Sequence, residues 1–218
     1  MKRVKMVFFL LAIFLPVLAG AQESKKKKEP KSNFSSQLWY QFYYFQQEDA
    51  FKEIYGREYF EPIGISFGGY PLRNLGINLN IGYVQKLGYA KGELTGETSG
   101  EKLRLILVPV QLELNYRFDF LEEQLFVPSV GVGGDWWYYK EHKYEEEDVE
   151  GDKSGWHASA GLSILLDRID PTTRFTLQDE FGIENVFLHL EVRWCWLESG
   201  DGLDLSGVGY SAGLLIEY

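Results

Sequence analysis

The stretch from Leu103 to Phe118 reads LRLILVPVQLELNYRF, and it decides the fold. Its second half alternates apolar side chains with the polar residues Gln111, Glu113, Asn115 and Arg117. Successive side chains of a strand point to opposite faces, so this alternation predicts a β-strand with one apolar and one polar face. The stretch is also longer than the roughly 5 to 6 residues that are typical of a strand.

The same alternation recurs from Phe34 to the end of the chain. We identify eight such runs: Ser36 to Gln46, Phe60 to Tyr70, Leu75 to Leu87, Leu103 to Phe118, Leu125 to Tyr139, Gly155 to Asp167, Asn185 to Leu197 and Leu205 to Tyr218. Several of them match the roughly 9 to 11 residues of a tilted strand that crosses a bilayer. The sequence therefore predicts an all-β fold, an eight-stranded antiparallel up-and-down transmembrane β-barrel.

The polar faces of the runs would line the lumen of such a barrel. They contain His157, Ser159, His189, Glu191, Arg193 and Glu217. We expect Glu113, Arg117, Glu191 and Arg193 to form a mixed-charge network that fills the lumen, because isolated charges there are costly.

A water-soluble, lipocalin-like barrel would show the same alternation with its faces exchanged. Two features favour the membrane form. Charges of both signs stand together in the middle of the polar faces, and aromatic residues gather near the strand ends, as at a membrane interface. One predicted girdle contains Tyr43, Tyr44, Phe45, Tyr59, Phe60, Trp136, Trp137, Tyr138, Tyr139, Trp156, Trp194 and Trp196, and the other contains Tyr116, Phe118, Phe120, Phe126 and Tyr218.

The first residues have the pattern of a secretory signal peptide. A basic start precedes an apolar run of 13 residues, Met6 to Leu18, which is too short to be a membrane-spanning helix. We expect residues 1–21 to be a cleaved signal peptide, residues 22–33 a disordered lysine-rich periplasmic leader, and residues 34–218 the outer-membrane barrel.

The connections between the runs indicate an orientation. Those after the odd runs are long and polar, namely Gln47 to Tyr59, Gly88 to Lys102 and Lys140 to Lys153. Two of those after the even runs are short, Pro71 to Asn74 and Asp119 to Gln124. Long connections are typical of the extracellular side, so both termini are expected in the periplasm. Arg168 to Glu184 is an exception that we expect to form a small helix or to extend the neighbouring strands.

Charge and cysteine content exclude several function classes. The formal net charge is −10, and the basic signal peptide contributes only positive charge, so nucleic acid is not an expected partner. Cys195 is the only cysteine and has no thiol partner for a disulfide or a structural zinc site.

Three motifs together resemble a known group of proteins. They are Val108-Pro109-Val110-Gln111-Leu112, the glycine-rich run from Val127 to Gly134, and Gly155 to Leu162. In this order they are similar to small outer-membrane barrels of the OmpA-like, OmpW-like and PorT-like group. The resemblance implies that the closing strand, ending at Tyr218, is read by the barrel-assembly machinery. No peptidoglycan-binding domain follows Tyr218, so that function of the group is not expected.

The sequence offers little chemistry for catalysis. His157 and Ser159 lie two positions apart on a lumen face, and with Asp135 or Asp167 they would resemble a Ser-His-acid site. A hydrogen-bonded lumen histidine is the simpler interpretation, because a lipid hydrolase must present its site to lipid.

The connection from Lys140 to Lys153 has seven acids but lacks the ligand spacing of a calcium loop. We therefore expect no catalytic, cofactor-binding or metal-binding residues.

An eight-stranded barrel is just narrow enough for side chains to fill its interior. We expect a monomeric protein of the Gram-negative outer membrane with a structural, adhesive or small-ligand-binding role, whose partners are lipid, lipopolysaccharide and the assembly machinery. The alternatives are a narrow channel or carrier for a small, hydrophobic molecule, and a lipid-modifying enzyme.

The closing strand generates a first prediction. Replacement Tyr218→Ala, or deletion of Tyr218, should lower the amount of folded barrel in the outer membrane, because it removes the terminal aromatic side chain that resembles the assembly signal. Quantitative immunoblotting of outer-membrane fractions measures this. Undiminished levels would show that the carboxyl terminus is not read in this way.

Overall fold

The computed structural model describes residues 34–72, 74–91, 98–121, 124–143, 148–167, 171–198 and 204–218. The predicted signal peptide and leader, and residues 144–147 of the acidic connection, lie outside these ranges. The elements in chain order are β1 Phe34–Phe45, α2 Glu48–Tyr55, β2 Tyr59–Phe60, β3 Ile63–Leu72, β4 Leu75–Lys91, β5 Thr98–Arg117, β6 Phe126–Lys143, β7 Val149–Leu165, α3 Pro171–Phe181, β8 Asn185–Leu197 and β9 Gly207–Glu217.

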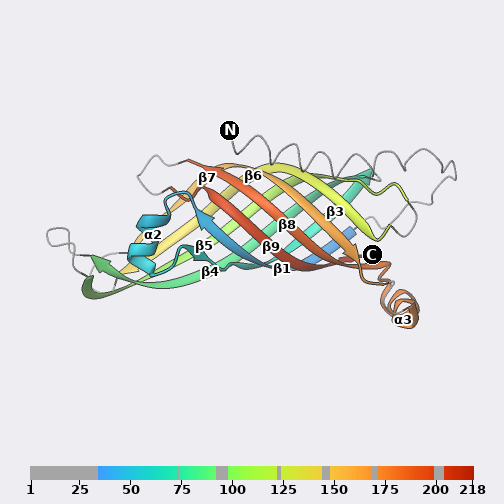
Figure 1. Ribbon diagram of the computed structural model, residues 1–218, viewed down its shortest axis with the longest axis horizontal. Coiled ribbons are helices and arrows are strands. Elements are labelled where there is room, and N and C mark those ends of the chain that lie inside the picture. Colours follow the sequence, from blue (N-terminus) through green and yellow to red (C-terminus); the bar gives the residue numbers. More distant parts are fainter. Residues whose placement is uncertain are drawn as a thin grey trace, which may run out of the picture.

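The strands form one antiparallel sheet that closes on itself (Figure 1). Its order is β2-β1-β3-β4-β5-β6-β7-β8-β9, and β1 also pairs with β9. The closing register runs from the Ser35–Glu217 pair to the Phe45–Gly207 pair. The two-residue β2 pairs with the end of β1 and belongs to the connection between β1 and β3. The other eight strands confirm the predicted antiparallel barrel.

Four strands continue beyond the predicted runs. β4 has 17 residues and β5 has 20, and they pair as far as Lys91 and Thr98. β6 and β7 likewise pair as far as Glu141 and Val149. The connections predicted as polar loops at these positions are therefore largely the ends of two long hairpins. Hairpin pairing does not depend on an apolar face, so the loss of hydrophobic alternation did not mark the ends of these strands.

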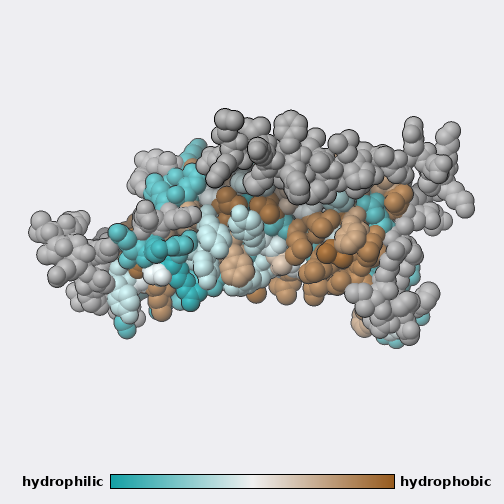
Figure 2. All heavy atoms as spheres, viewed as in Figure 1, coloured by the Kyte–Doolittle hydropathy of each residue, from teal (hydrophilic) through white to brown (hydrophobic). Residues whose placement is uncertain are grey.

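The apolar faces of the strands point outward and the polar faces inward. On β5, Leu112 and Leu114 are 57% and 46% exposed, whereas Glu113 between them is 1% exposed. On the face that Figure 2 shows, hydrophobic side chains gather from the middle of the barrel toward α3, and hydrophilic ones gather toward α2. This arrangement contradicts a water-soluble barrel and is the one that lipid outside and a polar lumen require.

The two helices mark opposite ends of the barrel, called the α2 end and the α3 end below (Figure 1). α3 falls within the long connection between β7 and β8, which agrees with the helical alternative for Arg168 to Glu184. Gly182 follows it with a φ of 67°, and Ile183 N–H donates to the Leu177 carbonyl at 3.1 Å. Glycine adopts this left-handed conformation without steric cost and so ends the helix.

α2 was not predicted, and it replaces part of the expected polar loop from Gln47 to Tyr59. Gly56, with a φ of 71°, ends the helix and donates its N–H to the Lys52 carbonyl at 2.9 Å. Phe51 is 4% exposed and stacks on Phe45 with ring centroids 3.9 Å apart. The helix therefore packs one apolar face onto the barrel interior.

The predicted girdle at the α2 end is only partly correct. Trp136, Trp156 and Trp196 are exposed on the outer wall. Five other members are buried inside the barrel instead: Tyr43, Phe45, Phe60, Trp137 and Tyr139. The prediction grouped aromatic residues by their position near strand ends. Their odd or even position along each strand decides which face they occupy, and this separates Trp136 from Trp137.

Candidate functional site

The lumen is filled by two large layers of side chains of different chemistry, and a small apolar cluster of Val127, Leu165, Phe187 and Leu215 lies beyond them at the α3 end. The layer toward the α3 end is polar and buries Ser35, Ser66, Asn80, Gln111, Glu113, Asn115, Arg117, Ser129, Asp135, His157, Ser159, Ser163, His189, Arg193 and Glu217. The layer toward the α2 end is apolar and contains Tyr43, Phe45, Phe51, Phe60, Val84, Leu105, Leu107, Trp137, Tyr139, Cys195, Leu197 and Leu205.

The Glu113 carboxylate lies at the centre of the polar layer. Its Oε2 accepts a hydrogen bond from Ser159 Oγ at 2.7 Å and lies 3.3 Å from His157 Nε2 and 3.6 Å from Arg193 Nη2. Asn78 and Asn115 each place Nδ2 3.4 Å from the other oxygen, Oε1. Partners from strands β4, β5, β7 and β8 therefore meet at one buried carboxylate.

His157 joins this carboxylate to a second one. Its Nδ1 lies 2.9 Å from Asp135 Oδ2, and the histidine is 0% exposed. Trp137 Nε1 donates to Asp135 Oδ1 at 3.3 Å. Gln111 donates to Asp135 and accepts from Arg193. The network thus extends across β5, β6, β7 and β8 and reaches the apolar layer through Trp137.

Arg193 connects the Glu113 carboxylate to a second group of polar side chains on β7 and β8. Its Nη2 lies 2.7 Å from Glu191 Oε1, and Glu191 Oε2 lies 3.6 Å from His189 Nε2. Ser163 Oγ is 2.8 Å from His189 Nδ1. Glu113, Glu191 and Arg193 therefore lie in one mixed-charge network, as the alternation on β5 and β8 led us to expect.

Arg117 does not belong to that network, which corrects the prediction that all four charged residues act together. It pairs with Glu217 of β9, and its Nη1 lies 3.2 Å from the Tyr70 hydroxyl. Its guanidinium lies over the rings of Tyr70 and Phe187, 5.4 and 5.2 Å from their centroids. Arg117 is four positions nearer the α3 end than Glu113, so it meets a different facing carboxylate.

A small polar cavity lies between the two charge groups. Its volume is about 30 Å³, and its lining includes Asn80, Arg117 and Arg193. Each of these three residues has a buried side-chain nitrogen without a hydrogen-bond partner in the protein. The volume suits about two water molecules. It is far from a continuous aqueous pore.

The apolar layer is held in place by α2 and by hydrogen bonds at its rim. Tyr43 Oη donates to the Leu205 carbonyl at 2.8 Å, and its ring lies 5.0 Å from that of Trp137. Tyr55 of α2 donates to Glu141 Oε2 at 3.0 Å. Burial, with the Glu141 carboxylate beside it, raises the pKa of Tyr55, so this hydroxyl keeps the proton that ties α2 to β6.

The structure does not bring His157 and Ser159 together as a base and a nucleophile. The Ser159 hydroxyl donates to Glu113, and His157 lies between Glu113 and Asp135. Asp167, the other candidate acid, accepts the Val186 N–H at 3.2 Å. These contacts match the simpler interpretation of a hydrogen-bonded lumen histidine.

The described part of the acidic connection is tied by internal ion pairs. Lys140 Nζ lies 3.0 Å from Asp148 and 3.4 Å from Glu150, and His142 also contacts Asp148. Hydrogen bonds from Lys140 and His142 lower the pKa of Asp148. Among the described residues, no group of three His, Cys, Asp or Glu side chains has an arrangement suited to a metal ion.

Helices in the described ranges are too short or too polar to cross a membrane.

The position of Arg193 generates a second prediction. Arg193→Leu should lower the free energy of unfolding by about 3 to 5 kcal/mol, because it leaves two buried carboxylates without their cation. Urea unfolding of the refolded protein in lipid vesicles measures the change. Arg57→Leu is the control, since Arg57 is an exposed cation paired with Glu61, and we expect a change of at most about 1 kcal/mol. Equal effects would contradict the network.

Gly133 and Gly134 provide a third prediction with its own control. A Cβ at Gly133 would lie 2.2 Å from the Leu112 carbonyl oxygen and 2.6 Å from the His157 ring. A Cβ at Gly134 would meet only the Gly155 oxygen, at 4.0 Å. Gly133→Ala should therefore destabilise the barrel by about 1 to 3 kcal/mol, whereas Gly134→Ala should change stability by at most about 0.5 kcal/mol. The same urea titration measures both, and equal stability of the two variants would contradict this packing.

Comparisons with known proteins support the fold but do not assign a specific function. No family model and no curated protein matches the chain. Among solved structures, the outer membrane protein OprG from Pseudomonas aeruginosa is 12% identical with a TM-score of 0.58, and the match covers 87% of this chain and 97% of that one. Neisserial surface protein A is 15% identical with a TM-score of 0.55, covering 87% and 100%.

The N-terminal β-barrel domain of Pseudomonas aeruginosa OprF is similar to the same extent. It is 12% identical, with a TM-score of 0.53, and the match covers 87% of this chain and 100% of that one. At these identities the likeness concerns the fold. The chain has the fold of the small eight-stranded outer-membrane β-barrels that its strand motifs resemble.

Proposed function

We propose that this protein is a sealed outer-membrane barrel that acts through its surface, in a structural, adhesive or small-ligand-binding role, and not by passing solutes. The filled lumen is the observation that carries the proposal. A polar network centred on Glu113 occupies one half of the interior, and an apolar cluster closed by Phe51 of α2 occupies the other. Both layers would have to open before a hydrated solute could pass.

The outer membrane is the location that agrees with the fold and with the apolar exterior. Export by the predicted signal peptide would leave the leader, residues 22–33, in the periplasm at the α3 end, where Phe34 begins β1. The α2 end with its two long hairpins would then face the outside of the cell. Assembly through the closing strand and a monomeric state belong to the same proposal.

We also propose that the protein is not an enzyme. The only Ser-His-acid set suggested by the sequence is engaged in other contacts, because Ser159 donates to Glu113 and His157 is buried between two carboxylates. Neither side chain is exposed to lipid.

One observation favours a second candidate function, a carrier for a small hydrophobic molecule. The apolar layer has aromatic walls, and Phe51, which closes it, belongs to a short helix and not to the barrel wall. Outward displacement of α2 would make an apolar site accessible from the α2 end. The closed arrangement described above supports the sealed barrel better.

Planar-bilayer conductance of the refolded protein tests the proposal and is our fourth prediction. The sealed barrel should give no unitary current steps, because neither layer contains a continuous water path. A general porin in the same bilayer serves as the positive control. Reproducible ion-conducting steps would contradict the proposal.

Binding of a small apolar fluorescent dye separates the carrier from the sealed barrel. For the sealed barrel, Phe51→Ala should leave the affinity for the dye unchanged within about twofold. A large gain in affinity for Phe51→Ala over the native protein would support the carrier instead. Anomalous gel migration of unheated samples and circular dichroism confirm that both proteins are folded.

A further inference from the structure

The outer wall of β5 and β6 changes sharply from apolar to charged side chains, whereas the outer face of β4 continues at the same level with Leu87 and Tyr89. On β5, the outward residues are Tyr116, Leu114, Leu112, Val110, Val108 and Ile106, followed by Arg104 and Lys102. The inward residues beside the last two, Leu103 and Leu105, are buried at 5% and 2% exposure. Arg104 and Lys102 therefore continue the lipid-facing row without a break.

Cross-strand pairing places the membrane boundary on this row. Val110 pairs with Trp136 and Val108 with Tyr138, so aromatic residues of β6 flank β5 just below the charges. Ile106 pairs with Lys140 in the next position toward the α2 end. Aromatic residues mark the interface of an outer-membrane barrel, so Arg104 and Lys102 lie just beyond it.

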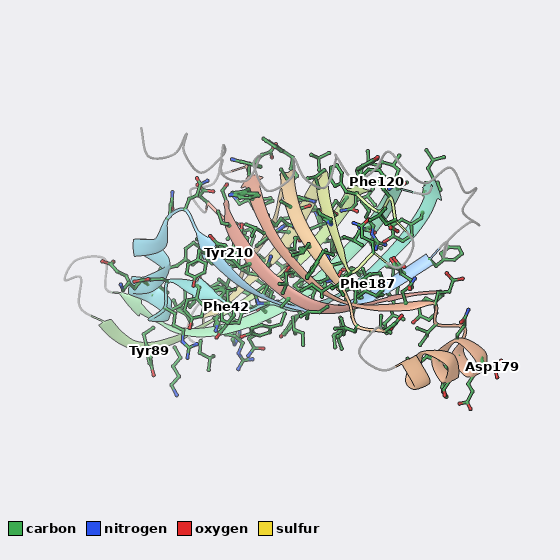
Figure 3. All side chains as sticks on the ribbon, turned by 45° about the vertical axis from the view of Figure 1, so that its right-hand side comes forward. Phe42, Tyr89, Phe120, Asp179, Phe187 and Tyr210 are labelled. Carbon is green, nitrogen blue, oxygen red and sulfur yellow. The ribbon has the colours of Figure 1, made fainter. Side chains whose placement is uncertain are left out.

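The length of the row agrees with this boundary. Tyr116 and Ile106 are ten residues apart, which is about 33 Å along a strand at ~3.3 Å per residue. A strand tilt of about 40° reduces this to ~25 Å across the membrane, the height of the apolar band of such barrels. Arg104 and Lys102 thus stand at the level of the lipid headgroups. Lys102 pairs with Tyr89, which lies toward the free end of the β4–β5 hairpin (Figure 3).

These two cations have no carboxylate partner within the described residues, unlike their neighbours. Lys140 is engaged with Asp148 and Glu150, and His142 with Asp148. Arg104 pairs across the strands with Leu87 and His142, and its buried Nε has no hydrogen-bond partner in the protein. Among the described residues, Arg104 and Lys102 are therefore the cations of this row that are left to bind an anionic acceptor.

We propose that Arg104 and Lys102 form a binding site on the outer wall for a phosphate group of the glycolipid of the outer leaflet, lipopolysaccharide. The arginine fork binds phosphate oxygens through two parallel hydrogen bonds, and lysine adds a point charge. The acids on β7 are held by Lys140, Trp136 and Tyr138, so they do not neutralise the site. The site rests on the outer-membrane placement in the proposed function and is independent of whether the lumen conducts.

Binding of purified lipid A to the refolded full barrel in detergent, measured by isothermal titration calorimetry, tests the site. Lipid A with both phosphates should bind at least tenfold more tightly than lipid A from which the phosphates have been removed. The double variant Lys102→Gln with Arg104→Gln should lose about 25-fold in affinity for the phosphorylated form, since each cation near a lipid surface contributes about a fivefold effect. Arg104→Lys keeps the charge and should recover most of the Arg104 contribution.

Arg57→Gln is the matched control, because Arg57 is a cation at the same end of the barrel that is already paired with Glu61. Its affinity should stay within about twofold of the native value. Equal binding of the two lipid forms, native affinity in the double variant, or an equal loss in Arg57→Gln would each overturn the proposal. Inorganic phosphate that binds as tightly as lipid A would also overturn it, in favour of a free-phosphate site. Ion-conducting steps in the planar-bilayer experiment would contradict the sealed barrel without changing the lipid A affinities. Failure of the phosphate site and failure of the sealed barrel are therefore distinguishable.

Discussion

The pairing of β1 with β9 is the interaction on which the rest of the structure depends. A bilayer offers no water to unpaired backbone groups, so a sheet can span it only if its two edges meet. Eleven residue pairs, from Ser35–Glu217 to Phe45–Gly207, make that closure. Once eight strands are closed, the width of the interior is fixed, and side chains must fill it.

The filling follows from the depth at which each side chain enters the lumen. In the half nearer α3, charged groups come from facing walls and satisfy one another around Glu113, with Arg117 and Glu217 as a separate pair. In the half nearer α2, aromatic side chains and α2 exclude water. Gly133 allows His157 to lie against the wall, because any Cβ there would occupy the space of the imidazole ring. Buried charge and buried apolar surface thus close the same bore in different ways.

Because side chains fill the lumen in the described part of the chain, the outer wall and the hairpins are the surfaces of the barrel that other molecules can reach. The outer wall of β5 runs from Tyr116 through an apolar row to Arg104 and Lys102, which have no carboxylate partner among the described residues. The position of a residue along such a strand therefore determines whether it lies in the apolar band or in the hairpin beyond it. This arrangement agrees with the location of the barrel in the outer membrane.

The all-β class, the eight barrel strands and the face of most residues within them follow from the amino-acid sequence alone, because a period of two is a local property of the backbone. The sequence placed Glu113, Glu191, Arg193 and His157 in the lumen for the same reason. The same period of two separates Trp137 and Tyr139, which face inward, from Trp136, which faces lipid; the girdle prediction was wrong for them because it used proximity to strand ends and not parity. The helix α2 was missed although Phe51, Ile54 and Tyr55 stand at the i, i+3 and i+4 positions of one helix face, because this short segment between two strand runs was interpreted as a polar loop.

Which side chains meet across the lumen follows from closure of the barrel and could not be predicted from single strands. Glu113 and Arg193 lie on β5 and β8, and their contact depends on the stagger between strands that ring closure imposes. The same stagger pairs Arg117 with Glu217, 100 positions away in the sequence. Period two fixes the face of each residue and leaves its height relative to the opposite wall open. That height is set when the whole barrel closes, and the residue pattern of a single strand carries no information about it.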